Sequence, residues 1–243
     1  MKFACKTHIG KVRRTNQDCY AVGELPGGVA WGVVCDGMGG ANGGNIASRT
    51  AVKTVSEKIA ASWRPGRGAN SICNLLKSVV SAANINVFDM ANAAEELAGM
   101  GTTIVLVLVV DGTAHIVHAG DSRAYFVKAN KTLVQITRDH SIVQALVEQG
   151  KLTEQEAREH PRRNVITRAL GVAETLDLDY NEVDLEKGEG LLLCTDGLTG
   201  YVEMEEIEQV LKSHPFVEGA EQLVDLANQK GGGDNITVVT ILQ

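Results

Sequence analysis

A buried strand that runs directly into a glycine cluster occupies residues 29–44, with the sequence VAWGVVCDGMGGANGG. Its first seven residues form a short apolar run, which is typical of a strand buried on both faces. Eight glycines lie between Gly27 and Gly44, and such a cluster indicates that the backbone approaches something closely here. Asp36 stands where the strand ends, and a helix is predicted to follow the glycines.

The rest of the chain is predicted to form further strands and helices in an α+β pattern. Helical periodicity predicts helices at 43–61, 70–95, 203–212 and 216–229. Strands are predicted at 3–9, 18–23, 29–35, 102–110, 113–118, 123–128, 132–136, 174–184, 190–195 and 235–242. Where successive strands are separated by fewer than the dozen residues that a parallel return needs, they are predicted to be antiparallel. Helix pairs separated from runs of strands then predict helices covering antiparallel sheets.

Composition and charge exclude several functional classes. The 243 residues are 44% hydrophobic and 22% charged, as in globular proteins, and the formal net charge of −7 lacks the basic footprint of a nucleic-acid-binding protein. The five cysteines include no C-x-x-C pair, which disfavours a disulfide framework or a structural zinc site. Because the N-terminus has no apolar signal-peptide core and the longest apolar run covers only 104–110, we expect a cytoplasmic protein without a membrane span.

Aspartates recur where predicted strands end. Asp111-Gly112 joins two β-branched strands and is typical of a tight hairpin. Asp36 and Asp196 instead follow buried strands without leading into an adjacent strand, and a carboxylate there is costly unless it is paired or metal-bound. Asp18, Asp121 and Asp234 have similar settings. Each alone is more typical of an Asx turn or a cap, but together they predict an oxygen-ligand site for magnesium or manganese.

Seven short motifs, in this order along the whole chain, carry a resemblance to a known family. They are Gly10-x-Val12-Arg13-x-x-Asn16-Gln17-Asp18, Cys35-Asp36-Gly37-Met38-Gly39-Gly40, Gly101-Thr102-Thr103, His118-Ala119-Gly120-Asp121-Ser122-Arg123, Thr137-Arg138-Asp139-His140-Ser141, Cys194-Thr195-Asp196-Gly197-Leu198 and Gly233-Asp234-Asn235-Ile236-Thr237. This order resembles the protein phosphatase 2C family of metal-dependent serine/threonine phosphatases, and its compact bacterial members in particular.

The resemblance implies a fold and a set of site residues. The fold is an αββα sandwich of two antiparallel sheets flanked by helix pairs, formed by a single catalytic domain over residues 1–243 with a flap insertion at about 141–175. In the family, the residue matching Asp36 bridges two metal ions and the carbonyl of Gly37 binds one of them. The matches to Asp196 and Asp234 complete the first-metal site, and Asp18 acts through metal-bound water. Asp121 is implied to hold a weaker third ion with Asp196.

The implied chemistry is hydrolysis of phosphoserine and phosphothreonine in proteins, by attack of a hydroxide that bridges two Mn²⁺ or Mg²⁺ ions. The implied catalytic residues are Arg13, Asp36, Asp196 and Asp234, and Arg13 is expected to bind the substrate phosphate with its planar guanidinium. The expected partners are phosphorylated targets of a serine/threonine kinase, with no nucleic acid and no membrane, and the protein is expected to be a monomer. Two alternatives stay open: a pseudophosphatase that binds phosphoproteins without hydrolysing them, and a phosphatase of small phosphate esters.

The histidines receive a separate interpretation. His8, His115, His118, His140, His160 and His214 share no metal-ligand spacing, and His118 is interpreted as an ordinary strand histidine. Family members often have a histidine at the position of Met38 or of Ala41. The sequence therefore predicts a metal site without a histidine general acid at either position.

Overall fold

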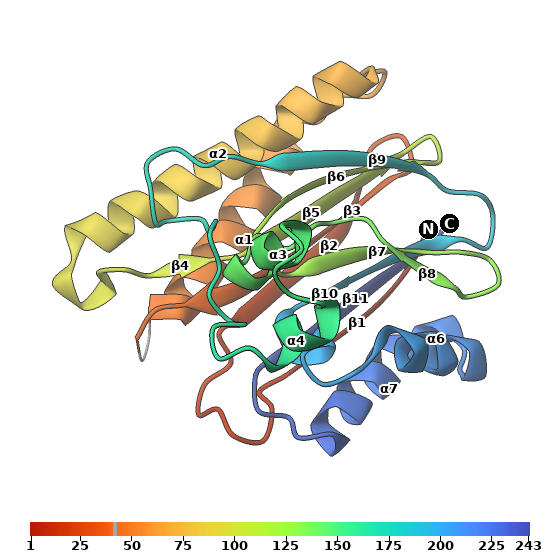
Figure 1. Ribbon diagram of the computed structural model, residues 1–243. Helices are drawn as coiled ribbons and strands as arrows, with labels where there is room; N and C mark the ends of the chain where they lie inside the picture. The colour runs from red at the N-terminus through yellow and green to blue at the C-terminus, as the bar shows by residue number, and fades with distance from the viewer. Residues whose placement is uncertain (41–42) are drawn as a thin grey trace.

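Two antiparallel sheets packed face to face form the centre of the computed structural model, which describes residues 1–40 and 43–243 (Figure 1). The first sheet has the order β1-β11-β10-β7-β8, with β1 (Lys2–His8), β11 (Ile236–Leu242), β10 (Gly190–Cys194), β7 (Arg123–Val127) and β8 (Leu133–Gln135). The second has the order β2-β3-β5-β6-β9, with β2 (Asp18–Leu25), β3 (Val29–Met38), β5 (Ile104–Val110), β6 (Thr113–Ala119) and β9 (Asp179–Asp184), and the short β4 (Gly101–Thr102) also pairs with β3.

Helices cover the outer face of each sheet. The second sheet is covered by α1 (Gly43–Ser62) and α2 (Ala69–Ala93), and the first by α6 (Met204–Ser213) and α7 (Phe216–Gln229), so that the helix pairs lie on opposite sides of the molecule (Figure 1). A third apolar cluster fills the space between the sheets. The α+β class and the αββα sandwich predicted from the sequence are therefore confirmed.

Strand β5 explains why the central strands have uninterrupted apolar sequences. Its seven residues are all buried. Leu106 and Leu108 belong to the cluster under α1 and α2, whereas Val105 and Val107 belong to the cluster between the sheets. Because successive side chains point to opposite faces of a strand, a strand in the middle layer of the sandwich needs apolar residues at every position. Full burial of each such side chain contributes about 1.5–3 kcal/mol.

Three predicted strands differ from the structure by more than two residues. The strand predicted at 29–35 continues to Met38, so Asp36 lies inside β3 and not at its end. The strand predicted at 102–110 is divided into β4 and β5 at Thr103, because the N–H of Asp36 donates to the hydroxyl of Thr103 at 2.9 Å instead of to its carbonyl. The strand predicted at 174–184 begins only at Asp179, which pairs with His118 near the end of β6. Residues before Asp179 have no partner strand there, and Leu176 and Leu178 pack against the helical cluster instead. The Asp111-Gly112 hairpin is confirmed, with φ of +50° and +84°.

Short helices occupy places where only loops or an amphipathic piece were predicted. They are η1 (Glu95–Leu97), α3 (Ile142–Glu148), α4 (Glu154–Glu159) and α5 (Asp196–Thr199). Helices α3 and α4 belong to residues 141–175, which we call the flap segment. Its first residue, Ser141, forms an isolated β-bridge with Ile166. In the described part of the chain, no helix is both long and apolar enough to cross a membrane.

Candidate metal centre

All five predicted aspartates lie at the same edge of the sandwich. Asp18 opens β2 and is directly opposite Asp36 of β3 in the strand register. Asp196 follows β10, Asp234 precedes the neighbouring β11, and Asp121 lies in the turn from β6 to β7. The charges of the other four aspartates all act on the carboxyl of Asp36. The two sheets therefore bring together residues that are more than 200 positions apart in the sequence.

Asp18 is the most deeply buried of the five carboxylates. Its Oδ2 accepts hydrogen bonds from the hydroxyls of Thr195 (2.9 Å) and Thr237 (2.7 Å). Its Oδ1 is buried and has no hydrogen-bond partner among the described residues, and the same is true of Oδ1 of Asp196. A buried carboxylate oxygen without a partner is costly. These two oxygens are therefore available to a cation or to water.

Burial and mutual repulsion raise the pKa values of this cluster. The largest cause is desolvation, which raises the pKa of Asp18 to about 7 and that of Asp121 to about 8, with the charge of Asp196 adding to both. The pKa of Asp36 lies well above its usual range for the same two reasons, and that of Asp196 is also raised. Carboxyls in this environment resist ionisation unless a positive charge joins them.

Two arginines lie near the cluster, but they differ in the charge they can offer. Nη2 of Arg13 donates to Oδ2 of Asp234 at 2.7 Å, and the Arg13 side chain is half exposed. Arg123 follows Asp121 by two residues, yet its guanidinium is held by both oxygens of Asp139, with Nε–Oδ1 at 2.9 Å and Nη2–Oδ2 at 2.7 Å. Because Asp139 neutralises Arg123, that arginine adds little positive charge to the cluster.

The Arg13 loop is fixed to the site by a residue whose role the sequence analysis missed. The side-chain amide of Asn235 donates to the carbonyls of Ile9 (2.9 Å) and Thr15 (3.0 Å), and its Oδ1 accepts from the N–H of Gln17 (2.8 Å). Asn235 is buried. The amide of a buried asparagine needs several hydrogen-bond partners. In the sequence, the sign of this role was that Asn235 directly follows Asp234 in the same motif. It anchors the loop that carries Arg13 beside Asp234.

Close backbone contact explains the glycines that follow Asp36. A Cβ on Gly37 would lie 2.0 Å from the carbonyl oxygen of Gly44, and a Cβ on Gly44 would lie 2.6 Å from that of Gly37. The beginning of α1 is therefore packed directly on the end of β3. Met38 is the last residue of β3, whereas Ala41, the other position considered for a histidine, lies outside the described residues.

The donor set matches a hard divalent cation. The predicted ligands are carboxylate oxygens and one carbonyl, which suit Mg²⁺ or Mn²⁺ better than a softer metal. The buried oxygens without partners and the raised pKa values both indicate that this edge of the sandwich lacks positive charge. The residues present thus fit divalent metal ions.

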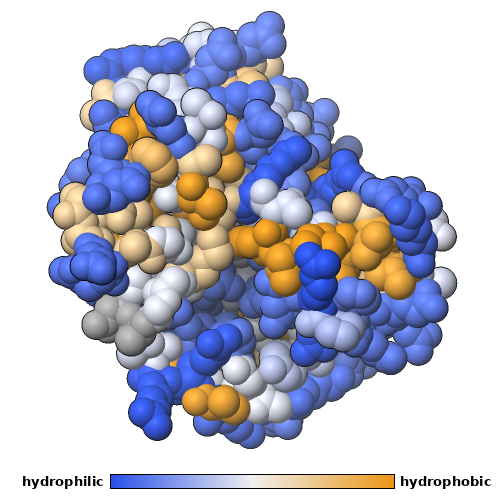
Figure 2. Space-filling view, turned by 60° about the vertical axis from the view of Figure 1, so that its left-hand side comes forward, coloured by the Kyte–Doolittle hydropathy of each residue, from blue (hydrophilic) through white to orange (hydrophobic). Residues whose placement is uncertain are grey.

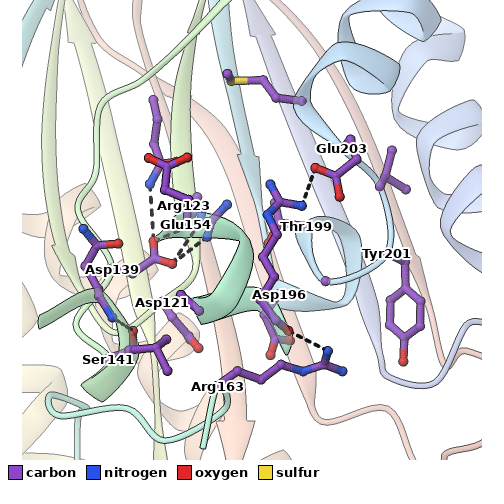
Figure 3. Close-up of a pocket in the computed structure, with 18 of the residues that line it drawn as sticks. Asp121, Arg123, Asp139, Ser141, Glu154, Arg163, Asp196, Thr199, Tyr201 and Glu203 are labelled. Atoms are coloured by element: carbon purple, nitrogen blue, oxygen red, sulfur yellow. Dashed lines mark hydrogen bonds and ion pairs between the residues drawn. The ribbon is translucent and has the colours of Figure 1, made fainter. Parts of the chain in front are cut away.

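A long groove leads away from the aspartates. It has a volume of about 1160 Å³ and lies between the flap segment, β8 and the region of α5 and α6, with Asp121, Asp196 and Asp234 in its lining. Figure 3 shows Asp121 and Asp196 side by side within it. Its other lining residues include apolar ones, among them Leu133, Val143 and Met204. Figure 2 shows hydrophobic side chains gathered around a hollow in the middle of the face that it draws.

Comparison with known proteins identifies the family. The model of the protein phosphatase 2C family matches residues 6–237. This chain belongs to the protein phosphatase 2C family. Among the curated family members, the serine/threonine phosphatase stp of Listeria monocytogenes is 35% identical over 240 residues, which are 97% of this chain and 93% of that protein.

Solved structures of family members have the same fold. The serine/threonine phosphatase of S. agalactiae superposes with a TM-score of 0.92 at 33% identity, covering 100% of this chain and 99% of that one. The catalytic domain of the phosphatase PstP, solved in complex with two manganese ions, has a TM-score of 0.86 at 32% identity and covers 98% of this chain and 96% of that one. Metal dependence is thus a property of the family, and a family member holds two Mn²⁺ ions.

The raised pKa values predict how the stability of the metal-free protein depends on pH. Between about pH 4 and about pH 8, the folded state binds more protons at Asp18 and Asp121 than the unfolded state does. The free energy of unfolding in EDTA should therefore fall as the pH rises through this window. Mn²⁺ should restore more stability at pH 8 than at pH 5, because it binds the ionised carboxylates.

Thermal unfolding of the wild type and of Asp18→Asn, in EDTA and in excess Mn²⁺, measures this effect. Asp18→Asn removes one titrating group and should reduce the pH dependence in EDTA. Equal pH dependence in the two proteins, or an Mn²⁺ effect that does not increase with pH, would contradict the account of the cluster.

Proposed function

We propose that this chain is a metal-dependent protein phosphatase that hydrolyses phosphoserine and phosphothreonine. The observation that carries the proposal is the cluster of buried and half-buried carboxylates at one end of the groove, with the guanidinium of Arg13 beside it. Membership of the protein phosphatase 2C family supports the same reaction. The proposal treats residues 1–243 as a single catalytic domain with the flap segment as an insertion.

The aspartates are assigned to metal binding. Asp36, Asp196, Asp234 and the carbonyl of Gly37 would hold two core ions, and Asp18 would act through water bound to them. Asp121 and Asp196 would hold a weaker third ion. Mn²⁺ or Mg²⁺ suits these oxygen donors. When bound, such ions stabilise negative charge on phosphate oxygens and make water a stronger nucleophile at neutral pH.

Arg13 is assigned to the substrate phosphate. Its guanidinium presents several N–H donors in one plane, which suits two phosphate oxygens. The Arg13 side chain is 52% exposed while it contacts Asp234, so its remaining donors are open to a ligand. Asn235 restrains the loop on both sides of Arg13, which reduces the entropy lost when the arginine binds phosphate.

The groove supports a protein substrate over a small phosphate ester. A volume of about 1160 Å³ greatly exceeds the space that a phosphoryl group and a small alcohol fill. Its lining combines apolar residues with charged ones on the flap segment and at the start of α6, such as Glu154 and Glu205. These surfaces would contact residues that flank a phosphorylated serine or threonine. The substrates would be phosphorylated targets of a serine/threonine kinase.

Two further parts of the proposal concern the setting of the protein. The five cysteines are all free thiols, which is typical of a reducing compartment and supports a cytoplasmic location. We also expect the protein to act as a monomer.

Activity toward matched substrates tests the proposed substrate class. A phosphothreonine peptide should be hydrolysed with a kcat/KM at least about tenfold above that of free phosphothreonine, because flanking residues add binding energy that reaches the transition state. Equal kcat/KM values for the two substrates would favour a phosphatase of small esters. Tight phosphopeptide binding without turnover in Mn²⁺ would favour a pseudophosphatase.

Removal of a core carboxylate tests the metal assignment. Asp36→Ala and Asp234→Ala should each lower Mn²⁺-dependent kcat/KM on the order of 10³-fold or more, because metal-ion stabilisation of the transition state is worth several kcal/mol. Asp225→Ala is the matched control, since Asp225 is an exposed aspartate on α7. Circular dichroism checks that all three variants fold. Near-normal turnover in both core variants would rule out the assignment.

Substitution of Arg13 separates phosphate binding from chemistry. Arg13→Ala should raise KM for a phosphopeptide by about 10- to 150-fold, the equivalent of losing about 1.5–3 kcal/mol of charge-assisted hydrogen bonding. Arg13→Lys keeps the charge without the planar donors and should fall between Arg13→Ala and the wild type. Steady-state kcat and KM measure the effect, and an unchanged kcat/KM in Arg13→Ala would show that the arginine does not bind phosphate.

A further inference from the structure

The turn that carries Asp121 has little conformational freedom. Gly120 adopts φ of +107°, and a Cβ there would lie 2.6 Å from Cγ2 of Thr103. The hydroxyl of Thr103 contacts that of Ser122 at 2.7 Å and accepts the N–H of Asp36 at 2.9 Å. The backbone on both sides of Asp121 is therefore fixed against the strand that carries Asp36.

His140 holds the same glycine from the other side. Its main-chain N–H donates to the carbonyl of Gly120 at 2.9 Å, and the N–H of Gly120 donates to Nδ1 of the His140 ring at 3.2 Å. Both hydrogen-bonding groups of Gly120 are thus used by one residue. His140 is buried, with 7% of its surface exposed, so water does not compete readily for these contacts.

The far side of the His140 ring is held by the end of the flap segment and by β9. On the other side of the ring, Nε2 lies 3.3 Å from Oδ2 of Asp179. Arg168 donates to Oδ1 of Asp179 at 2.8 Å, and this shared carboxylate brings its Nη1 to 3.0 Å from Nε2. The ring is therefore fixed at both nitrogens.

His118 lies beside His140 and Asp179, but the three residues do not form a metal site. Among the residues that the structure describes, His118, His140 and Asp179 are the group of three whose metal-ligand atoms approach within 4.8 Å of one another. The two rings, however, are stacked with centroids 4.7 Å apart and planes 8° from parallel. Each nitrogen lone pair lies in the plane of its own ring, so two stacked rings cannot both direct one at the same ion. His118 instead covers the face of the His140 ring.

His140 also connects this turn to the flap segment. Its carbonyl accepts the N–H of Thr167 at 2.7 Å, and the next residue, Ser141, forms the bridge with Ile166. The flap segment therefore leaves and rejoins the sandwich beside the turn that carries Asp121.

We propose that His140 is a positioning residue that acts through Gly120 to hold Asp121 toward the metal centre and to couple that aspartate to the end of the flap segment. The effect on turnover that this proposal expects rests on the proposed function. The hydrogen bonds of Gly120 are independent of that function.

Two variants of His140 separate positioning from general packing. In His140→Asn the side-chain oxygen takes approximately the place of Nδ1 and can accept from Gly120, although the contact with Asp179 is lost. In His140→Gln the longer side chain places its amide nearer to the position of Nε2 and leaves Gly120 without its acceptor. His115→Gln is the control, because His115 is a buried histidine of β6 that does not contact Gly120 and instead contacts Tyr180 at 2.7 Å.

Hydrogen exchange of the Gly120 amide in the metal-free protein, followed by NMR, tests the contact directly. Exchange should be about tenfold faster in His140→Gln and nearly unchanged in His140→Asn and His115→Gln. An unchanged Gly120 rate in His140→Gln, or equal acceleration in all three variants, would overturn the proposal whether or not the protein is a phosphatase.

A double-mutant cycle tests whether His140 acts through Asp121. Mn²⁺ titration calorimetry and kcat for a phosphopeptide are measured for wild type, His140→Gln, Asp121→Ala and the double variant. His140→Gln should weaken the same low-affinity Mn²⁺ binding that Asp121→Ala removes, and the double variant should be no worse than Asp121→Ala. Fully additive losses would overturn the proposal. If Asp121→Ala itself changes neither measurement, the assigned role of Asp121 fails while the exchange experiment still decides the positioning role.

Discussion

Repulsion among buried and half-buried carboxylates is the interaction on which the site depends. Five aspartates meet at one edge of the sandwich, and the burial and mutual repulsion that raise the pKa values of Asp18, Asp36, Asp121 and Asp196 would destabilise the fold if all were ionised. Among the described residues, the ion-pair partner of Arg13 is Asp234, and Arg123 is held by Asp139. Divalent cations relieve this repulsion, so the cluster favours binding of metal ions. Such ions can in turn stabilise the negative charge of a phosphate.

The sandwich maintains this arrangement through contacts made mostly by uncharged groups. The close approach of Gly37 and Gly44 sets α1 on the end of β3. The hydroxyls of Thr195 and Thr237 orient Asp18. Asn235 fixes the Arg13 loop, and His140 accepts a hydrogen bond from the residue before Asp121. A hydrophobic core on both faces of β3 and β5 keeps these strand ends in register. Small displacements of the carboxylates are thereby resisted from several directions.

Much of the fold could be predicted because it follows from local sequence, and the aspartate cluster could be predicted because acidic residues recur at strand ends in the family's order of motifs. The apolar run of β5 and the Asp-Gly pairs at 36–37 and 196–197 are local signals, and the order of motifs added the family. Contacts between distant segments could not be predicted in the same way. Nothing near residue 174 shows that β6 ends opposite Asp179, and the spacing of His118 and His140 does not reveal that their rings stack. The pairing of Arg13 with Asp234 depends on a loop geometry that only the folded chain defines.

The location of bound metal tests the central claim most directly. Crystals of the wild type soaked in Mn²⁺ would be measured on either side of the manganese absorption edge to give an anomalous difference map. The account predicts two strong peaks enclosed by the carboxylates of Asp36, Asp196 and Asp234 and the carbonyl of Gly37. Absence of peaks at this edge of the sandwich, or manganese bound instead between His118, His140 and Asp179, would contradict it.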